Sequence, residues 1–290
     1  MTFSEVLAAL KITHHTSGHH HCRSGWVQLD CPFCGKGSGK FHLGYNIRQH
    51  YMNCWKCGPH PVAYTLYRAS HASKDRIGEL LGSLDRTDLL AEDSPVLTGR
   101  LRLPKGLEPL AAPHRRKLEG RGFDPDELEK LWRLQGLGRT AELPWRIFIP
   151  IFYRSKMVSW TTRSLGEKQR YISASLADED MDHKHLLYGQ DYCGHSIVIV
   201  EGPTDVWNVG PGAAATFGLS YTVQQVKKAG AHPYRYVCFD SSKAAQSRAL
   251  QLADLLSVFP GETHVVELDA EDPGSASKKE VKALRKLAKL

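Results

Sequence analysis

The residues of this chain that are best placed to do chemistry begin with four cysteines in two close pairs. Cys31 and Cys34 form the first pair, and Cys54 and Cys57 form the second, with nineteen residues between the pairs. Each Cys-x-x-Cys turn points two thiolates at one place, so two such turns supply the four sulfurs of a closed tetrahedral zinc site. Because the text between the pairs alternates in the manner of a short hairpin, we expect a structural zinc ion in a small ribbon-like domain.

Carboxylates make up the second group, and each follows a stretch that predicts a buried strand. Glu201 comes directly after the apolar run "SIVIV", Asp240 ends "YRYVCFD", and Asp272 comes shortly after "HVVEL". Oxygen ligands of this kind suit Mg²⁺ or Mn²⁺ that is shared with water and substrate phosphates. The pattern therefore indicates metal-assisted phosphoryl or nucleotidyl transfer. The alternative is that these acids only cap helices.

The elements that must position these acids alternate between strand and helix along residues 195–290. We expect strands at "SIVIV", "AAATFG", "YRYVCFD" and "HVVEL", with a helix after each of the first three. Such alternation gives a parallel sheet with crossover helices, and ligands bind beyond the carboxyl ends of its strands. Glu201, Asp240 and Asp272 should therefore converge at one edge of the sheet.

Composition narrows the classes of protein that remain. The formal net charge of the 290 residues is +7 and the pI is about 9.0, which favours a polyanionic partner such as nucleic acid. No apolar run is long enough to cross a membrane, and the N-terminus lacks the features of a secretory signal. We therefore expect a cytoplasmic protein whose paired cysteines bind metal rather than form disulfides.

Basic residues interleaved with aromatic ones indicate two surfaces for nucleic acid. One lies in the loop between the cysteine pairs, where cations would contact phosphates and rings would stack on the bases of a single strand. The other lies in a β-rich middle region that contains "WRIFIPIFY" and "MVSWTTRS", where clustered cations would hold backbone phosphates. The candidate residues are Lys36, Lys40 and Arg48 in the loop, and Arg146, Arg163 and Lys184 in the middle region.

These patterns divide the chain into four parts. Residues 1–84 form a zinc-binding domain that ends in two short amphipathic helices, and residues 85–113, with four prolines, form a linker. Residues 114–194 form a basic β-rich subdomain, in which Asp124 and Pro125 begin a helix. Residues 195–290 form the α/β domain with the acid-tipped sheet, and its last stretch is a basic amphipathic helix.

In this order, the zinc ribbon, the basic middle region and the acid-tipped sheet resemble the DnaG-type DNA primases of phages and plasmids, over nearly the whole chain. "EGPTDVW" resembles the EGxxD motif of their Toprim domain, "FDSSKAA" their DxDxxG-like motif and "EDPG" their third acidic motif. The resemblance implies an α/β Toprim core with a β-rich basic subdomain, preceded by a small zinc-ribbon domain that helps to recognise the template. It further implies a nucleotidyltransferase that makes short RNA primers on single-stranded DNA from nucleoside triphosphates, with a replicative helicase as a candidate partner.

The resemblance also gives each acid a role. Glu201 matches the Toprim glutamate, a candidate acid/base or metal ligand, and Asp205 matches the second acid of that motif. Asp240 matches the first aspartate of DxD, and Asp272 matches the acid before proline. The implied ligands of the catalytic Mg²⁺ or Mn²⁺ are Glu201, Asp240 and Asp272. The family's cations for template or nucleotide phosphates fall at the positions of Arg146, Arg163 and Lys184.

The motifs also depart from the family. The second aspartate of DxD is Ser242, the expected glycine is Ala245, and a further acid expected two positions after Asp272 is Gly274. A neutral hydroxyl is a poorer ligand for a hard dication than a carboxylate, so the second metal should bind weakly. Two alternatives therefore stay open: a primase-derived factor that binds single-stranded DNA but polymerises poorly, and a Toprim nuclease that degrades DNA.

Overall fold

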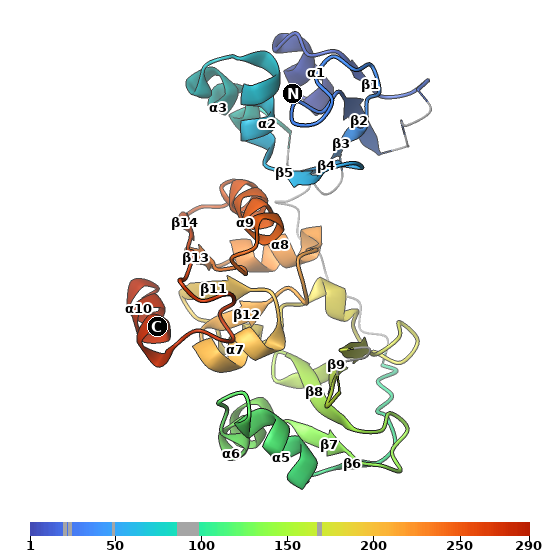
Figure 1. Ribbon diagram of the computed structural model, residues 1–290, viewed down its shortest axis with the longest axis vertical. Coiled ribbons are helices and arrows are strands. Elements are labelled where there is room, and N and C mark those ends of the chain that lie inside the picture. The colour runs from blue at the N-terminus through green and yellow to red at the C-terminus, as the bar shows by residue number, and fades with distance from the viewer. Residues whose placement is uncertain (20–21, 23–24, 48–49, 86–98, 167–169) are drawn as a thin grey trace. The chain divides into compact units, whose positions relative to one another are not determined.

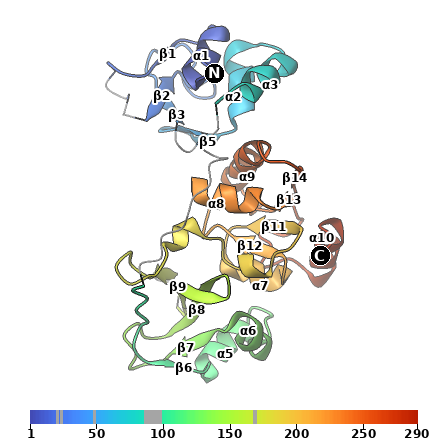
Figure 2. The same ribbon diagram turned by 180° about the vertical axis from the view of Figure 1, so that it is seen from behind.

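The computed structural model describes residues 1–19, 22, 25–47, 50–85, 99–166 and 170–290. The chain divides into two units: unit 1 comprises Met1–Ala91 and Ser241–Val265, and unit 2 comprises Glu92–Asp240 and Val266–Leu290. Figures 1 and 2 show the elements of each unit from opposite sides. None of the helices in the described ranges combines the length and the hydrophobicity needed to cross a lipid bilayer.

Unit 1 is built on an antiparallel sheet that brings the two cysteine pairs together. Its strands lie in the order β1 (His14–His15), β2 (Trp26–Leu29), β3 (Leu43–Asn46), β4 (Tyr51–Cys54) and β5 (Gly58–His60). The hairpin expected between the cysteine pairs is formed by β3 and β4. In one row across the sheet, Leu29 pairs with Leu43 and Leu43 pairs with Cys54. Since the first cysteine pair follows β2 and the second begins at the end of β4, both pairs lie at the same end of the sheet.

Apolar side chains of three helices complete the core of this sheet. The helices are α1 (Phe3–Ala9), α2 (Val62–Ser70) and α3 (Lys74–Gly82), so the two helices expected within residues 61–83 are present. A capping box starts α1, because Thr2 and Glu5 each bond the other's backbone N–H. Phe3 of α1 stacks on Tyr45 of β3, with ring centroids 3.6 Å apart. This contact anchors the N-terminus on the ribbon sheet.

Unit 1 also takes in Ser241–Val265, which was predicted to belong to the Toprim domain. This segment contains α9 (Lys243–Leu256) and β14 (Glu262–Val265). The Ser247 hydroxyl donates to the Pro59 carbonyl at 3.0 Å, and the Gln251 amide donates to the Met52 carbonyl at 3.4 Å. These two bonds join α9 to β5 and β4.

The first part of unit 2 is an antiparallel sheet, the β-rich region expected from the sequence. Its strands lie in the order β10 (Tyr171–Ser173), β9 (Lys156–Ser164), β8 (Arg146–Tyr153), β7 (Gln135–Leu137) and β6 (Leu107–Glu108). Side chains alternate between the two faces of a strand. Ile147 and Ile149 of β8 therefore enter the main core of the unit, whereas Phe148 packs with Trp160 on the other face.

Ordered structure occupies the second half of the segment predicted as a linker, residues 85–113. Residues 86–98 lie outside the described ranges. Leu107 of β6 pairs with Leu137 of β7, Leu110 is 5% exposed, and α5 (Ala112–Glu119) starts within the segment. Because strand pairing and leucine burial are contacts with distant residues, the proline content could not reveal them. Residues 99–113 are part of unit 2.

The helix predicted at Asp124 begins as expected. The Asp124 side chain accepts the N–H of Asp126 at 2.9 Å, and Pro125 is the first residue of α6 (Pro125–Trp132). Leu128 and Trp132, four residues apart, lie on one side of α6 and enter the main core. The cap thus fixes where α6 starts, and its apolar side fixes how it packs.

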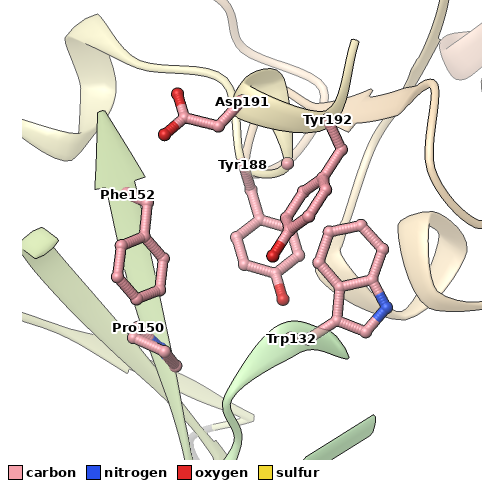
Figure 3. Close-up of a pocket in the computed structure, with 7 residues that line it drawn as sticks. Trp132, Pro150, Phe152, Tyr188, Asp191 and Tyr192 are labelled. Carbon is pink, nitrogen blue, oxygen red and sulfur yellow. The ribbon is translucent and has the colours of Figure 1, made fainter. Parts of the chain in front are cut away.

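The tip of the β8–β9 hairpin has an uncommon backbone. Arg154 and Ser155 adopt φ values of 51° and 64°, in the left-handed region that residues other than glycine rarely occupy. The Asp191 carboxylate accepts both of their N–H groups, at 3.1 and 2.7 Å, and thereby holds the turn. Asp191 belongs to the short 3₁₀ helix η2 (Gln190–Tyr192), beside a small pocket between Trp132 and Phe152 (Figure 3).

Three parallel strands lie in the order β12 (Ala213–Ala215), β11 (Ser196–Val200) and β13 (Tyr234–Val237), and Glu201 and Asp240 follow the last two. The crossover helices are α7 (Pro203–Val209) and α8 (Val223–Gly230), so the expected strand–helix alternation is confirmed. The predicted C-terminal helix is α10 (Lys278–Leu287). At the edge of the sheet, Tyr188 exchanges two backbone hydrogen bonds of 2.9 Å with Ala215. The segment that follows the antiparallel sheet thus covers β12.

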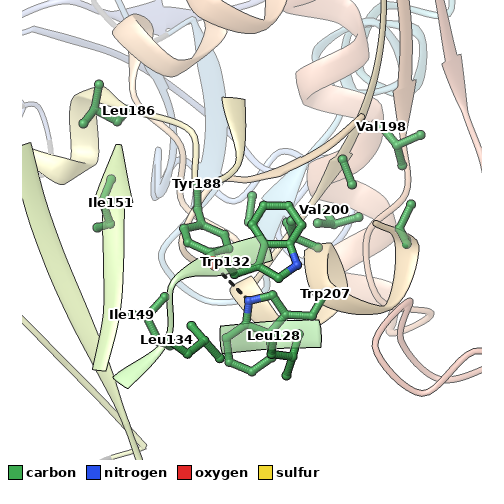
Figure 4. Close-up of a cluster of buried hydrophobic side chains, with 14 of the residues drawn as sticks. Leu128, Trp132, Leu134, Ile149, Ile151, Leu186, Tyr188, Val198, Val200 and Trp207 are labelled. Carbon is green, nitrogen blue, oxygen red and sulfur yellow. Dashed lines mark hydrogen bonds between the residues drawn. The ribbon is translucent and has the colours of Figure 1, made fainter. Parts of the chain in front are cut away.

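One apolar core joins β8, α6, β11 and α7 within unit 2 (Figure 4). At its centre, the indole N–H of Trp207 on α7 donates to the Tyr188 hydroxyl at 2.9 Å. Both side chains are buried, and burial raises the pKa of Tyr188 well above its ordinary value. A buried N–H needs an acceptor, so this bond fixes α7 against the Tyr188 segment.

Replacing Tyr188 with phenylalanine should lower the free energy of unfolding by about 1–3 kcal/mol, because the Trp207 N–H would be left buried without an acceptor. Urea denaturation of the full chain measures the change. Tyr192→Phe is the matched control: its hydroxyl donates to the Leu131 carbonyl at 2.7 Å, but Tyr192 is 37% exposed, so water can replace the lost bond. Equal losses in the two variants would contradict the role of the Tyr188–Trp207 bond.

Candidate active site and metal centres

The predicted acids Glu201, Asp205 and Asp240 lie around the carboxyl ends of β11 and β13. Glu201 directly follows β11, Asp240 lies three residues beyond β13, and Asp205 lies in the first turn of α7. The Glu201 carboxylate accepts the N–H of Asp240 at 3.0 Å, which joins the ends of two neighbouring strands. The Asp205 carboxylate accepts the N–H of Gly202 at 2.8 Å. The Glu-Gly-x-x-Asp segment therefore forms a tight turn at the start of α7.

Asp272 reaches the same group from the loop that precedes α10. The backbone N–H of Val266 donates to the Val237 carbonyl at 2.9 Å, which returns the chain alongside β13. Further along, Asn208 of α7 donates to the Pro273 carbonyl at 2.8 Å and ties the loop to the helix that carries Asp205. The fourth predicted acid is thus brought to the other three.

Gly274 occupies the position where the resemblance leads one to expect a further acid. A Cβ atom here would lie 2.6 Å from one Asp205 carboxylate oxygen and 3.2 Å from an Asp272 carboxylate oxygen. The backbone N–H of Gly274 also bonds Asp205. Glycine therefore lets the backbone pass between two carboxylates, and any side chain at this position would push them apart.

Burial and mutual repulsion make these carboxyl groups hard to ionise. Burial, followed by the charge of Asp240, raises the pKa of Glu201 to about 7. Burial raises the pKa of Asp205 to about 7, with further repulsion from Asp240 and Asp272. The pKa of Asp240 is raised to about 6 by burial and by Asp272 and Glu271. Neighbouring carboxyl groups with raised pKa values are typical of functional sites, and a cation bound among them would favour their ionised forms.

The oxygens of the four acids are spread more widely than the donors of a closed metal site. In the described part of the chain, three or more ligand atoms within 4.8 Å of one another occur at the four paired cysteines and at Glu179, Asp182 and His183, but not among the four acids. A hard cation at such an open site takes one or two carboxylates and completes its coordination with water and phosphate oxygens. The donor set therefore fits Mg²⁺ or Mn²⁺.

Arg121, which the sequence analysis does not name, lies near these acids, and the predicted Arg163 lies near Arg121. Arg163 on β9 lies with its guanidinium carbon 5.2 Å from the centre of the Tyr171 ring. Arg121, in the turn between α5 and α6, is close enough to Arg163, Asp205 and Asp272 for their charges to affect its pKa, which burial and Arg163 lower. Its signal in the sequence is an arginine between two glycines. The Arg121 guanidinium near the carboxylates suits the phosphates of a nucleotide. Arg163 is only 7% exposed and donates to the Tyr171 hydroxyl, so it has little free surface for a phosphate.

The other predicted cations of the middle region are held by the fold. Arg146 is 6% exposed, and its guanidinium donates to the Thr162 hydroxyl at 2.7 Å and to the Arg170 carbonyl at 3.2 Å. It ties β8 to β9 and has almost no surface for a phosphate, contrary to the expectation. The partly buried Lys184 donates to the Phe217 carbonyl at 3.0 Å, and burial lowers its pKa.

The four predicted zinc ligands meet in unit 1. Their sulfurs all lie within 4.8 Å of one another, with 3.5 Å between Cys31 and Cys57 and 3.6 Å between Cys34 and Cys54. None of the four forms a disulfide, and burial raises the pKa of the Cys31 thiol to about 11. A bound cation is what turns such thiols into thiolates. Four clustered sulfurs fit a tetrahedral structural zinc ion.

The cations of the loop between the cysteine pairs lie in different surroundings. Lys40 lines a pocket of about 290 Å³ together with Trp55, Lys56 and four other residues. Trp55 is 47% exposed, so the pocket offers an aromatic ring beside two ammonium groups. Lys36 lies with its ammonium 2.8 Å from the His71 imidazole, and Arg48 lies outside the described ranges.

No protein-family model matches the chain, and no curated protein matches it. The solved structures that match include the zinc-binding and RNA polymerase domains of the Aquifex aeolicus primase, with a TM-score of 0.49 and 15% identity over 100% of this chain and 83% of that one. The catalytic core of the E. coli primase matches with a TM-score of 0.42 and 21% identity over 59% of this chain and 63% of that one. The primase fragment of the bacteriophage T7 primase-helicase protein matches with a TM-score of 0.42 and 16% identity over 86% of this chain and 92% of that one. These solved structures come from bacterial and phage primases.

Proposed function

We propose that this protein is a DNA primase that synthesises short RNA primers on single-stranded DNA by metal-assisted nucleotidyl transfer. The observation that carries the proposal is the meeting of Glu201, Asp205, Asp240 and Asp272 in unit 2, with the Glu-Gly-x-x-Asp order of a Toprim domain. Their raised pKa values and spread oxygens favour a site that takes cations together with nucleotide phosphates. The cysteine cluster adds the ribbon domain with which primases of this type hold a template.

In the proposed reaction, Glu201 and Asp240 would hold the catalytic cation, with Asp272 as a further ligand. When bound there, a divalent cation would neutralise charge at the triphosphate and favour ionisation of the attacking hydroxyl. Asp205 bonds the Gly202 N–H and so keeps the turn that presents Glu201 in place. Arg121 would bind the triphosphate oxygens, and positioning of this kind supplies much of the catalysis in phosphoryl transfer.

The pocket at Lys40, Trp55 and Lys56 is the proposed template contact of unit 1. An exposed indole ring offers a surface on which a base can stack, and the two ammonium groups suit the phosphates on either side of that base. The net charge of +7 favours the same kind of partner over the whole chain. The resemblance of the sequence motifs to DnaG-type primases of phages and plasmids also leads us to propose a cytoplasmic location. It makes a replicative helicase the candidate protein partner.

Two departures from the family bear on the choice of metal. The Ser242 hydroxyl accepts the N–H of Ala245 at 3.2 Å as the N-cap of α9, and a neutral hydroxyl is a poorer ligand for a hard dication than a carboxylate. Gly274 provides no side chain at all. With both family carboxylates absent, we infer that a second cation binds weakly. Mn²⁺ binds a given set of ligands more tightly than Mg²⁺ does in most cases, so Mn²⁺ should support the higher activity.

Asp240→Asn should lower primer synthesis by about 100-fold or more, since changing even a residue that only supports a metal ligand costs about 10–100-fold. Incorporation of labelled nucleoside triphosphates on single-stranded DNA, with Mn²⁺ present, measures the effect. Glu127→Gln is the control, because Glu127 is an exposed acid on α6 and is not one of the four predicted acids. Full activity of Asp240→Asn would show that these acids are not the catalytic site.

The same assay separates the competing functions. A parent protein that binds single-stranded DNA but incorporates no nucleotide with either metal would be the primase-derived binding factor. A parent protein that shortens the DNA without nucleoside triphosphates would be a Toprim nuclease. Template-dependent products that require all four triphosphates support the primase.

The acid cluster should make stability depend on pH in a sense opposite to most carboxylates. The folded-state pKa values of about 7, 7 and 6 for Glu201, Asp205 and Asp240 exceed the ordinary values of 4.5, 3.8 and 3.8. The contribution of these three protonated acids to the stability of the fold is therefore complete below about pH 4. It is lost as the pH rises through 6 and 7. Without added Mg²⁺ or Mn²⁺, Tm should fall by several degrees between about pH 5.5 and pH 8. Added Mn²⁺ should raise Tm more at the higher pH, because it binds the ionised acids.

Differential scanning calorimetry measures the dependence of Tm on pH. Chelators are left out, because they would also remove zinc from the four cysteines. Glu201→Gln removes one of the titrating groups and should flatten the fall in Tm. A fall of the same size in parent and variant would assign the pH dependence to other groups.

Trp55→Ala should weaken binding of single-stranded DNA by about 1–3 kcal/mol, because it removes a stacking surface. Lys40→Ala should instead lower the salt dependence of binding by roughly one unit of slope. Fluorescence anisotropy with a labelled oligonucleotide at several salt concentrations measures both. Tyr64→Ala removes another exposed ring of unit 1, 51% exposed on α2, and should leave affinity unchanged. An equal loss for Trp55→Ala and Tyr64→Ala would rule out a specific template pocket.

A further inference from the structure

The sulfurs of the cysteine cluster fall into two kinds according to the N–H groups beside them. The first cysteine of each pair receives backbone N–H groups. Those of Phe33 and Cys34 bond Cys31. Those of Lys56 and Cys57 bond Cys54, with Lys56 N at 3.4 Å from the sulfur. These bonds follow from the tight turn that every Cys-x-x-Cys pair makes.

The second cysteine of each pair has an imidazole in the equivalent place. His42 Nε2 lies 3.3 Å from the Cys34 sulfur, and His60 Nε2 lies 3.0 Å from the Cys57 sulfur. His60 Nε2 is also 4.0 Å from the Cys31 sulfur. His42 comes from the chain just before β3 and His60 from the end of β5. Two elements that are distant in the sequence therefore each place an imidazole beside the second cysteine of a pair.

The fold holds both imidazoles in place. His42 is 8% exposed, and a Cβ atom at Gly35 would lie 2.6 Å from its Cε1, so only glycine at position 35 lets the ring reach Cys34. The His60 ring stacks on Phe33, with centroids 4.0 Å apart and planes 15° from parallel. Neither ring can turn away from its sulfur without losing these contacts.

The choice of tautomer follows from the surroundings of His42. Its Nδ1 is buried and has no hydrogen-bond partner among the described residues. A proton on Nδ1 would be a buried donor without an acceptor, and it would leave a lone pair of Nε2 facing an anionic sulfur. With the proton on Nε2, the imidazole donates to the thiolate, and the Nε2 lone pair no longer faces the anionic sulfur. The ring therefore suits a thiolate, which is the form of cysteine that binds zinc.

We propose that His42 and His60 are positioning residues of the zinc site, which donate their Nε2–H groups to the zinc-bound thiolates of Cys34 and Cys57. Four thiolates on one Zn²⁺ carry a net charge of −2, and each N–H donor disperses part of it. Backbone N–H groups do this for Cys31 and Cys54, and the imidazoles do it for the other two. The four sulfurs already lie within 4.8 Å of one another without either imidazole, so the histidines support the ligand set and do not belong to it. This role is independent of whether the chain synthesises primers.

The test is the rate at which the full-length zinc-loaded protein releases zinc to an excess of a chromophoric chelator. His60→Met and His42→Met remove the donor and keep an apolar side chain of similar volume. Each should release zinc about 10-fold faster or more, the usual cost of losing a hydrogen bond to a metal ligand. His60→Gln and His42→Gln keep a side-chain N–H and should stay close to the parent rate. His14→Met is the control, because His14 bonds Ser4 and Ile12 in the same unit and touches no sulfur.

Substitution with Co²⁺ distinguishes a donor from a ligand. The absorption bands of a four-thiolate cobalt site should be unchanged in position in every variant. A shift of these bands in His60→Met would make His60 a ligand and overturn the proposal. Equal release rates for the methionine and glutamine variants, or rates no faster than that of His14→Met, would overturn it as well. Should the methionine variants fail to fold, the glutamine variants decide: a parental release rate supports the proposal, and a 10-fold faster one overturns it.

Discussion

Repulsion among buried carboxylates is the constraint on which unit 2 depends. Glu201, Asp205 and Asp240 would be fully ionised at neutral pH in water, yet in the fold their pKa values rise to between about 6 and 7. What holds them together is backbone structure that does not depend on their charge. Every residue of β11 is buried, and its pairing with β12 and β13 fixes where the strands end. The fold thereby keeps the acids in a place where a cation lowers their energy.

The antiparallel sheet of unit 2 brings positive charge toward these carboxylates. It is joined to the parallel strands by a shared apolar core and by the bond between Tyr188 and Trp207. Through that junction, Arg121 in the α5–α6 turn comes to lie near the acids, with Arg163 on β9 close to Arg121. Negative and positive groups brought together by separate elements form a site that suits both a metal ion and the phosphates it carries. Neither sheet alone would provide it.

Unit 1 meets a related electrostatic problem with different groups. Four thiolates on one zinc ion leave excess negative charge, and here neutral N–H groups rather than cations surround it. The local Cys-x-x-Cys turns supply such groups to Cys31 and Cys54, whereas His42 and His60 lie beside the remaining sulfurs. The two units thus surround clustered anionic groups in two ways: an arginine lies near the carboxylates of unit 2, and N–H groups lie beside the sulfurs of unit 1.

The sequence by itself determined the features whose signals are local. The cysteine spacing, the hairpin between the pairs, the helix start at Asp124 and the strands that end before Glu201 and Asp240 all depend on residues close together in the chain, where turn and period rules act directly. Only the tertiary structure decided which arginine faces the acids. The sequence places Arg146 in a cluster of cations for phosphates, but in the fold it is 6% exposed and bonds Thr162 and the Arg170 carbonyl. The position of Arg121 near the acids could not be predicted from the sequence, because its neighbours in space come from distant segments. Spacing along a chain encodes geometry within a turn or a strand, whereas burial and charge pairing depend on which elements pack together.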